Sequence, residues 1–153
     1  MKSLAYSEQK VLQSLDGITL TTLGKPYFIA KEGMLTEEEI KAWGGNVRIY
    51  PAGHPPEEYR AMILDGINQA VQAVSGEYDL VILDEYNMAC WYDLATEEDT
   101  KKILSARASG VELVFTGRNA PSYILEAADL ITEMKKIRHY YDKGVPQRKG
   151  IED

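Results

Sequence analysis

The chain has 153 residues, enough for one domain with a substantial core. Its 17 lysines and arginines against 24 acids give a formal net charge of −7, which argues against a general nucleic-acid binder because such a protein needs a basic face. Cys90 is the only cysteine, so no intrachain disulfide can form and a reducing cytoplasm is expected. We expect no membrane span, because no apolar run approaches the ~20 residues that a span needs. We expect no secretory signal, because the first residues contain no long apolar stretch.

The first half of the chain predicts short elements that are separated by glycine and proline. Apolar spacing, a capping box and turn residues indicate, in order, a helix over 7–15, a half-buried strand over 18–23, a turn over 24–29, a helix that begins at Thr36 and ends at Gly44, and a loop over 50–56.

The second half predicts longer elements that alternate between helix and strand. They are a helix from Pro56 or Glu57 to Val74, a strand over 78–83, a helix from Thr96 to about Ala106, a strand over 111–115, a helix over 121–128, a strand over 130–137 and a polar tail from Tyr140. This alternation indicates an α/β fold whose strands pair in parallel through right-handed crossovers. We expect a single domain over 1–153.

Two carboxylates follow the apolar run Leu80–Leu83 directly, namely Asp84 and Glu85. If the strand continued through them, their side chains would point to opposite sides. Ligands bind at the carboxyl ends of strands in open α/β sheets, and magnesium takes one or two carboxylates together with phosphate oxygens. The pair therefore predicts a magnesium site, and the alternative is an acid that only caps the next loop.

A second strand end carries Thr116-Gly117-Arg118-Asn119. The Arg118 guanidinium is suited to gripping phosphate with its planar fork, and the alternative is a surface ion pair. Asn119 is expected to cap the helix that Pro121 opens, or to donate a hydrogen bond to a ligand.

Aromatic and basic residues supply two further candidate sites. Tyr27 and Phe28 lie in a glycine-proline turn and are either a wall for a planar ligand or partly core. Arg138 and His139 belong to a basic stretch near the C-terminus, which is either a solvated face or a contact for an anionic substrate. A structural zinc site is not expected, because His54 is the only other histidine.

Several of these segments resemble the ATP:corrinoid adenosyltransferase family of the P-loop type, whose members act on cob(I)alamin and cob(I)yrinic acid a,c-diamide. The resemblance is carried in order by 83–87, 116–121, 126–134 and the tail from Ile137 to Glu152, and it is looser over 1–76. It implies a three-layer, mostly parallel sheet of the P-loop NTPase (RecA-like) type and a homodimer.

The chain departs from the family pattern at its beginning. Nowhere does it contain a Gly-x-x-x-x-Gly-Lys-Ser/Thr phosphate loop. Family members begin with a strand, this phosphate loop, a helix and a second strand, so the chain resembles the family with its N-terminal part removed, and the expected fold is N-terminally incomplete.

The resemblance also implies a reaction and a set of residues. The 5′-deoxyadenosyl group of ATP would move to Co(I) of a corrinoid, with release of triphosphate and with Mg²⁺ as cofactor. The implied roles are catalysis for Glu85 and Arg118, metal binding for Asp84 and Glu85, and substrate binding for Tyr27, Phe28, Asn119, Arg138 and His139. Two alternatives stay open: a non-catalytic module that binds a corrinoid or a partner, and a generic nucleotide-binding α/β domain.

Overall fold

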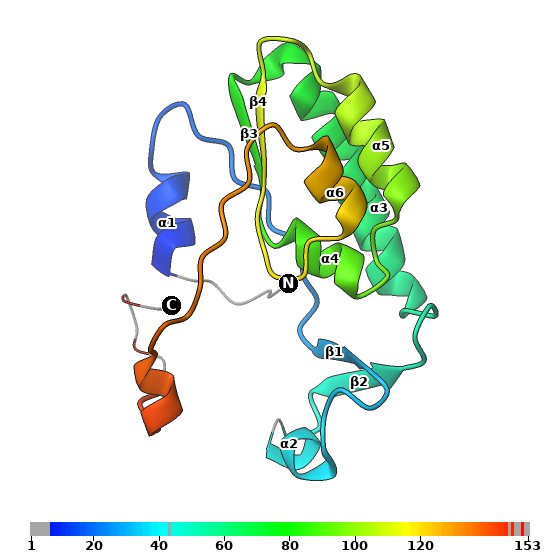
Figure 1. Ribbon diagram of the computed structural model, residues 1–153, viewed down its shortest axis with the longest axis vertical. Coiled ribbons are helices and arrows are strands. Elements are labelled where there is room, and N and C mark those ends of the chain that lie inside the picture. The colour runs from blue at the N-terminus through cyan, green and yellow to red at the C-terminus, as the bar shows by residue number, and fades with distance from the viewer. Residues whose placement is uncertain (1–6, 43, 147, 149–150, 152–153) are drawn as a thin grey trace. The chain divides into compact units, whose positions relative to one another are not determined.

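The protein is described from a computed structural model that covers residues 7–42, 44–146, 148 and 151 (Figure 1). Its contacts divide the chain into two compact units: Leu23–Ala128 belongs to the first, and 3–22 with Asp129–Asp153 to the second. The expectation of a single domain stays a prediction. The mixture of helices with parallel strand pairs confirms the α/β class.

The first unit holds most of the secondary structure. Its elements are β1 (Phe28–Lys31), α2 (Glu37–Ala42), β2 (Val47–Tyr50), α3 (Glu57–Gln72) followed by a π-helical turn (Ala73–Glu77), β3 (Leu80–Leu83), α4 (Tyr86–Trp91), α5 (Glu97–Ala106), β4 (Glu112–Phe115) and α6 (Ser122–Ala127). The second unit holds α1 (Ser7–Gln13) and a short 3-10 turn (Tyr140–Lys143).

Helix α3 provides one side of the core. Tyr59, Ile63 and Ile67 repeat at helical spacing and are 1%, 5% and 4% exposed. Each such side chain contributes about 2 kcal/mol when buried. Gly66 lies within this apolar helix without ending it. A Cβ at this position would lie 2.2 Å from a methyl carbon of Leu23, so the glycine lets the Leu23 side chain pack closely against the helix. The predicted helix is therefore confirmed, and the glycine serves close packing.

Helix α5 begins at the capping box that its sequence predicts. The Thr96 hydroxyl accepts from the Asp99 backbone N–H at 3.2 Å, and the Asp99 carboxylate accepts from the Thr96 N–H at 3.0 Å. Ile103 of this helix is fully buried in the same core as α3. The helix layer of α3 and α5 beside β3 and β4 is visible in Figure 1.

Strands β3 and β4 pair in parallel, with Leu80 opposite Glu112 and Leu83 opposite Phe115. The parallel pairing was predicted and is confirmed. The near-continuous apolar runs over 80–83 and 113–115 also predict that both strands are buried, and this prediction is wrong for one face of the pair. Val81 is 8% exposed and packs into the core, whereas Ile82 is 56% exposed. Alternate residues of a strand point to opposite faces, so helices cover one face only in the described part of the chain, and the three-layer arrangement stays a prediction.

A second parallel pair, β1 with β2, was not predicted from the sequence. Phe28 is opposite Val47, so the segment over 24–29, expected as a turn, already enters a strand at its end. Figure 1 shows this pair and α4 beyond the carboxyl ends of β3 and β4. The hydroxyl of Tyr50 donates to the backbone oxygen of Tyr92 at 2.7 Å, which links the end of β2 to the residue after α4.

Two predicted strands, over 18–23 and 130–137, are absent from the structure. A strand needs a neighbour to accept and donate its backbone hydrogen bonds. Neither segment has such a neighbour among the described residues. Met134 and Ile137 are 94% and 91% exposed, so the apolar pattern that predicted the second strand is not used for burial.

None of the helices in the described ranges is long and apolar enough to span a membrane.

Candidate functional site

Asp84 and Glu85 leave β3 through a sharp turn. The strand ends at Leu83, and Glu85 adopts a left-handed backbone with φ of 56° before α4 begins at Tyr86. The strand does not continue through the two acids, so the condition under which their side chains would alternate is not met. Left-handed backbone is costly for a residue with a side chain, and such strain is found preferentially at functional sites. Both acids are exposed to solvent.

Thr116 joins the two strand ends. The register that places Leu83 opposite Phe115 brings Thr116 beside Asp84. The Thr116 hydroxyl donates to Oδ1 of Asp84 at 2.6 Å and accepts from the backbone N–H of Glu85 at 2.9 Å. No role was predicted for this threonine from the sequence, although its position directly after an apolar run matches that of Asp84.

Asn87 and Gly117 complete this contact. The Asn87 backbone N–H donates to Thr116 O, and its Nδ2 donates to Gly117 O, both at 3.1 Å. Gly117 has φ of +116°, and a Cβ there would lie 3.3 Å from Cα of Glu85. The two loops therefore approach so closely that glycine is required. We call the hydrogen-bonded residues Asp84, Glu85, Asn87, Thr116 and Gly117 the strand-end clamp.

One atom of the strand-end clamp lacks a partner. Asn87 is 5% exposed, and its Oδ1 is buried without a hydrogen bond among the described residues. An unpaired buried acceptor costs about 1 to 3 kcal/mol. The amide orientation is fixed, because the opposite orientation would place Oδ1 against the carbonyl oxygen of Gly117. The clamp thus contains local strain and an unsatisfied group, which is not the pattern of a purely structural turn.

Arg118 and Asn119 follow the strand-end clamp directly. Arg118 is exposed and makes no ion pair with any acid in the part of the chain that the structure describes. The alternative of a surface ion pair therefore finds no support. The expectation that Asn119 caps α6 is wrong, because Pro121 is the N-cap and no side chain forms a capping hydrogen bond there. Asn119 instead adopts a left-handed backbone with φ of 59°.

Tyr27 belongs to a cluster at the start of α3. Its hydroxyl donates to Oε1 of Glu58 at 2.5 Å, the Arg48 guanidinium lies 4.5 Å above its ring centre, and the Tyr59 ring meets it edge-on at 5.3 Å. Burial and the hydrogen bond to Glu58 raise the pKa of Tyr27 to about 12. Phe28 next to it is half-buried in β1. Both aromatic side chains are thus partly packed, in line with the alternative that they belong partly to the core.

Arg138 and His139 lie in the second unit. His139 precedes the 3-10 turn and caps it, since its Nδ1 accepts from the backbone N–H of Tyr141 at 3.0 Å. Its ring also lies 4.5 Å from that of Tyr140. The structure thus gives His139 a local capping role, and the expected contact of Arg138 and His139 with substrate stays a prediction.

Asp84 and Glu85 can hold a metal only together with ligands from elsewhere. The described residues contain no group of three or more histidine, cysteine or acidic side chains that could hold an ion. Asp84 nevertheless has one oxygen, Oδ2, that takes part in no hydrogen bond within the described ranges, and two exposed carboxylates suit magnesium when phosphates and water complete its shell. The residues present therefore fit magnesium bound with a polyphosphate.

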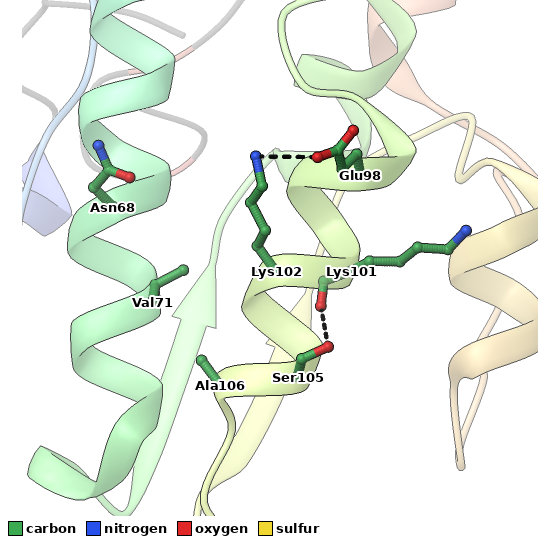
Figure 2. Close-up of a pocket in the computed structure, with 7 residues that line it drawn as sticks. All are labelled: Asn68, Val71, Glu98, Lys101, Lys102, Ser105 and Ala106. Atoms are coloured by element: carbon green, nitrogen blue, oxygen red, sulfur yellow. Dashed lines mark hydrogen bonds and ion pairs between the residues drawn. The ribbon is translucent and has the colours of Figure 1, made fainter.

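A groove between α3 and α5 is separate from the strand-end clamp (Figure 2). It holds about 580 Å³ and is lined by Asn68 and Val71 of α3 and by lysines of α5. Lys102 pairs with Glu98 at 3.6 Å and Lys101 with Glu97 at 2.6 Å. Because an acid of the same helix lies beside each of these lysines, they give the groove no clear excess of positive charge.

Comparison with known protein families finds a match to ATP:corrinoid adenosyltransferase BtuR/CobO/CobP over residues 1–152. The chain is 36% identical over 74 residues to a corrinoid adenosyltransferase of Sinorhizobium sp, a match that covers 48% of this chain and 35% of that protein. It is 34% identical over 74 residues to the corrinoid adenosyltransferase CobA of Salmonella typhimurium (48% and 38%). For a corrinoid adenosyltransferase of Pseudomonas aeruginosa, the identity is 36% over 73 residues (48% and 36%).

These matches span only about a third of the length of each relative, 35 to 38%. The family match, in contrast, extends over nearly the whole chain. The tandem strand-end motifs that suggested the family in the sequence are the same segments that form the strand-end clamp in the structure. The chain therefore belongs to the ATP:corrinoid adenosyltransferase family.

Proposed function

We propose that this chain carries the adenosyl-transfer site of a corrinoid adenosyltransferase, with ATP and a Co(I) corrinoid as its two substrates. The observation that carries the proposal is the pair of strand ends: two exposed acids after β3 are hydrogen-bonded to the end of β4, and an arginine that forms no ion pair among the described residues follows. The family match supports the class of reaction.

The proposed chemistry makes few demands for proton transfer. The electron pair of Co(I) attacks C5′ of the ribose, the C5′–O bond breaks, and triphosphate leaves with that bond pair, so that cobalt becomes alkylated Co(III). Co(I) is a strong nucleophile and needs no general base. The site must instead stabilise the leaving charge and hold C5′ in line with cobalt. A site with acids, an arginine and aromatics but no catalytic triad fits these demands.

Charge on the leaving triphosphate is the main electrostatic problem. Magnesium, when bound, would neutralise part of that charge, and Asp84 and Glu85 are the residues that would hold it. Arg118 would bind phosphate oxygens through its fork, because no acid among the described residues competes for it. Glu85 and Arg118 are therefore the proposed catalytic residues.

Aromatic and basic residues would bind the corrinoid. The Tyr27 ring is held in place by Arg48 and Tyr59, so Tyr27 with Phe28 would offer a fixed apolar wall to the planar macrocycle. Asn119, Arg138 and His139 would supply polar contacts. The family resemblance supports assembly as a homodimer, and this too is a proposal.

A second candidate function is a module that binds a corrinoid or a partner without catalysis. The observation that favours it is the absence of a Gly-x-x-x-x-Gly-Lys-Ser/Thr segment from the sequence. Such a loop surrounds phosphates with backbone N–H groups and a lysine, so a chain that acts without it is expected to bind ATP weakly.

Two measurements on the full chain separate these functions. Chemically reduced cob(I)alamin is mixed with MgATP and the chain, and the formation of the cobalt–carbon bond is followed by visible absorption. Calorimetry with MgATP measures nucleotide affinity, for which we expect a millimolar dissociation constant, roughly −4 kcal/mol. Transfer above the protein-free rate supports the enzyme, whereas corrinoid binding with no transfer supports the module. Binding of ATP without any binding of corrinoid would contradict both the enzyme and a corrinoid-binding module.

A further inference from the structure

Thr116 occupies one oxygen of Asp84 and leaves the other open. An ionised carboxylate only accepts hydrogen bonds, and a backbone N–H only donates. The Thr116 hydroxyl must therefore donate to Oδ1 of Asp84 and accept from Glu85 N–H, as the distances of 2.6 and 2.9 Å show. Oδ2 of Asp84 has no hydrogen bond within the described ranges.

The backbone of Thr116 is fixed as firmly as its hydroxyl. Its N–H donates to Leu83 O at 3.2 Å, and its carbonyl oxygen accepts from Asn87 N–H at 3.1 Å. Threonine is β-branched, so its side chain has few rotamers once the backbone is set. The hydroxyl is thus a preorganised group rather than a mobile one.

The arrangement also explains the strained neighbours. Glu85 adopts its left-handed backbone while its N–H is bonded to the Thr116 hydroxyl, and Asn87 remains in place with an unpaired buried oxygen. These costs persist only where the surroundings impose them. A turn that served stability alone would have no reason to keep both.

We infer that Thr116 is a positioning residue, whose hydroxyl orients Asp84 so that Oδ2 alone is presented to a hydrated divalent cation and holds Glu85 beside it. This inference rests on the proposed use of Asp84 and Glu85 at magnesium. It assigns Asp84 a single metal-facing oxygen, because the other is held by Thr116. Thr116 itself touches neither substrate nor metal.

Two substitutions at Thr116 and one control substitution test the role of the Thr116 hydroxyl. Thr116→Val keeps the shape and loses both hydrogen bonds, whereas Thr116→Ser keeps the hydroxyl and loses only a methyl group. Thr36→Val is the matched control, because the Thr36 hydroxyl also donates to a carboxylate (Glu39, 3.0 Å) and accepts a backbone N–H (3.2 Å), but at the start of α2. Amide NMR spectra establish that each variant is folded.

The first readout is binding of Mn²⁺ alone to the full chain, measured by paramagnetic broadening of backbone amide signals. In the unsubstituted chain and in Thr36→Val, we expect the amides of residues 84–87 and 116–118 to broaden first. Thr116→Val should need about tenfold more Mn²⁺ to reach the same broadening, which corresponds to a loss of about 1.4 kcal/mol of binding free energy. Thr116→Ser should stay within about twofold of the unsubstituted chain, which converts to less than about 0.5 kcal/mol.

The second readout is the dependence of adenosyl transfer on Mg²⁺. Thr116→Val should raise the Mg²⁺ concentration at half-maximal rate, while the rate at saturating Mg²⁺ stays close to that of the unsubstituted chain. A purely structural role would instead lower the melting temperature and leave the metal dependence unchanged.

The inference is overturned if the amide signals of Thr116→Val broaden at the same Mn²⁺ concentration as those of the unsubstituted chain. It is also overturned if no amide signal of residues 84–87 in the unsubstituted chain broadens with Mn²⁺. Neither result depends on catalysis. If the unsubstituted chain transfers no adenosyl group, the proposed function fails, and the Mn²⁺ comparison still decides the role of Thr116.

Discussion

Arg60 of α3 forms an ion pair with Asp99 of α5, in which Nη2 and Oδ2 are 2.7 Å apart and the Asp99 side chain is only 4% exposed. Arg60 also donates to the backbone oxygen of Leu94. Asp99 at the same time closes the capping box of α5 through Thr96. One buried carboxylate therefore ties the two helices that support β3 and β4.

We predict that Asp99→Ala lowers the free energy of unfolding by about 3 kcal/mol, because it leaves the Arg60 guanidinium without its carboxylate partner and removes the carboxylate half of the capping box. Glu97→Ala is the control, since Glu97 forms an exposed ion pair with Lys101, and its substitution should cost less than about 0.5 kcal/mol. Chemical denaturation of both variants measures the difference. Equal stabilities would show that the buried pair contributes no more than a surface pair.

The same carboxylate predicts a dependence of stability on pH. Burial alone would raise the pKa of Asp99, but the hydrogen bonds from Thr96 and the charge of Arg60 outweigh it and hold the pKa below its usual range. A lowered pKa in the folded state stabilises the fold above the unfolded value, about 3.9, and this contribution is lost as the pH falls toward the folded value. Asp99→Asn should reduce this acid dependence. An unchanged pH profile in Asp99→Asn would assign the acid sensitivity to other carboxylates.

Gly117 tests the close approach of the two strand ends. We expect Gly117→Ala to destabilise the chain by about 1 to 3 kcal/mol, because φ of +116° is strained for alanine and the new Cβ would lie 3.3 Å from Glu85 Cα. Gly33→Ala is the matched control, with φ of +80° but no atom within 4 Å. The difference between the two losses, measured by thermal unfolding, reports the contact. If both variants lose the same stability, the backbone conformation alone explains the glycine.

Tyr27 tests the proposed corrinoid wall. Tyr27→Phe removes the hydrogen bond to Glu58 but keeps the ring, so corrinoid affinity should change less than twofold, or about 0.4 kcal/mol. Tyr27→Ala removes the ring and should weaken binding about tenfold, the order expected for a lost aromatic contact. Titrations followed by visible absorption measure both. Equal affinity in Tyr27→Ala and the unsubstituted chain would remove Tyr27 from the site.

The uncovered face of β3 and β4 predicts self-association of the chain. Leu80 and Ile82 are 51% and 56% exposed on this face, and Val114 beside them is 40% exposed. Exposed apolar strands of this kind associate readily. We expect light scattering to show a mass that rises with concentration, and Ile82→Lys to reduce that rise. A monomer at every concentration would contradict both the association through the exposed face of β3 and β4 and the proposed homodimer.

Local patterns predicted the elements of the core and their pairing. The helix over 57–72 has apolar residues at helical spacing, Thr96 begins a capping box, and the two apolar runs at 80–83 and 112–115 form parallel strands. In each of these segments, the pattern of neighbouring residues indicates helix or strand, and the alternation of helices and strands along the chain indicates the parallel pairing.

The missed features depend on contacts between distant residues. The stretch over 130–137 has the composition of a strand but lacks a pairing partner in the described ranges, and β1 and β2 are recognisable only through each other. Asp84 and Glu85 were found because acids after an apolar run are conspicuous. Thr116 was missed as a functional residue, since its role follows from the register that places it beside Asp84.

The most direct test of the account measures adenosyl transfer and melting temperature together for Glu85→Gln and Arg118→Ala. Both side chains are exposed, so we expect melting temperatures within about 2 °C of the unsubstituted chain, a change of less than about 0.5 kcal/mol. Transfer should slow more than tenfold, or about 1.4 kcal/mol, in each variant, because one loses a charge proposed to act on magnesium and the other a cation proposed to act on triphosphate. Unchanged transfer in both, whatever the melting temperatures, would contradict the claim that the two strand ends carry the chemistry.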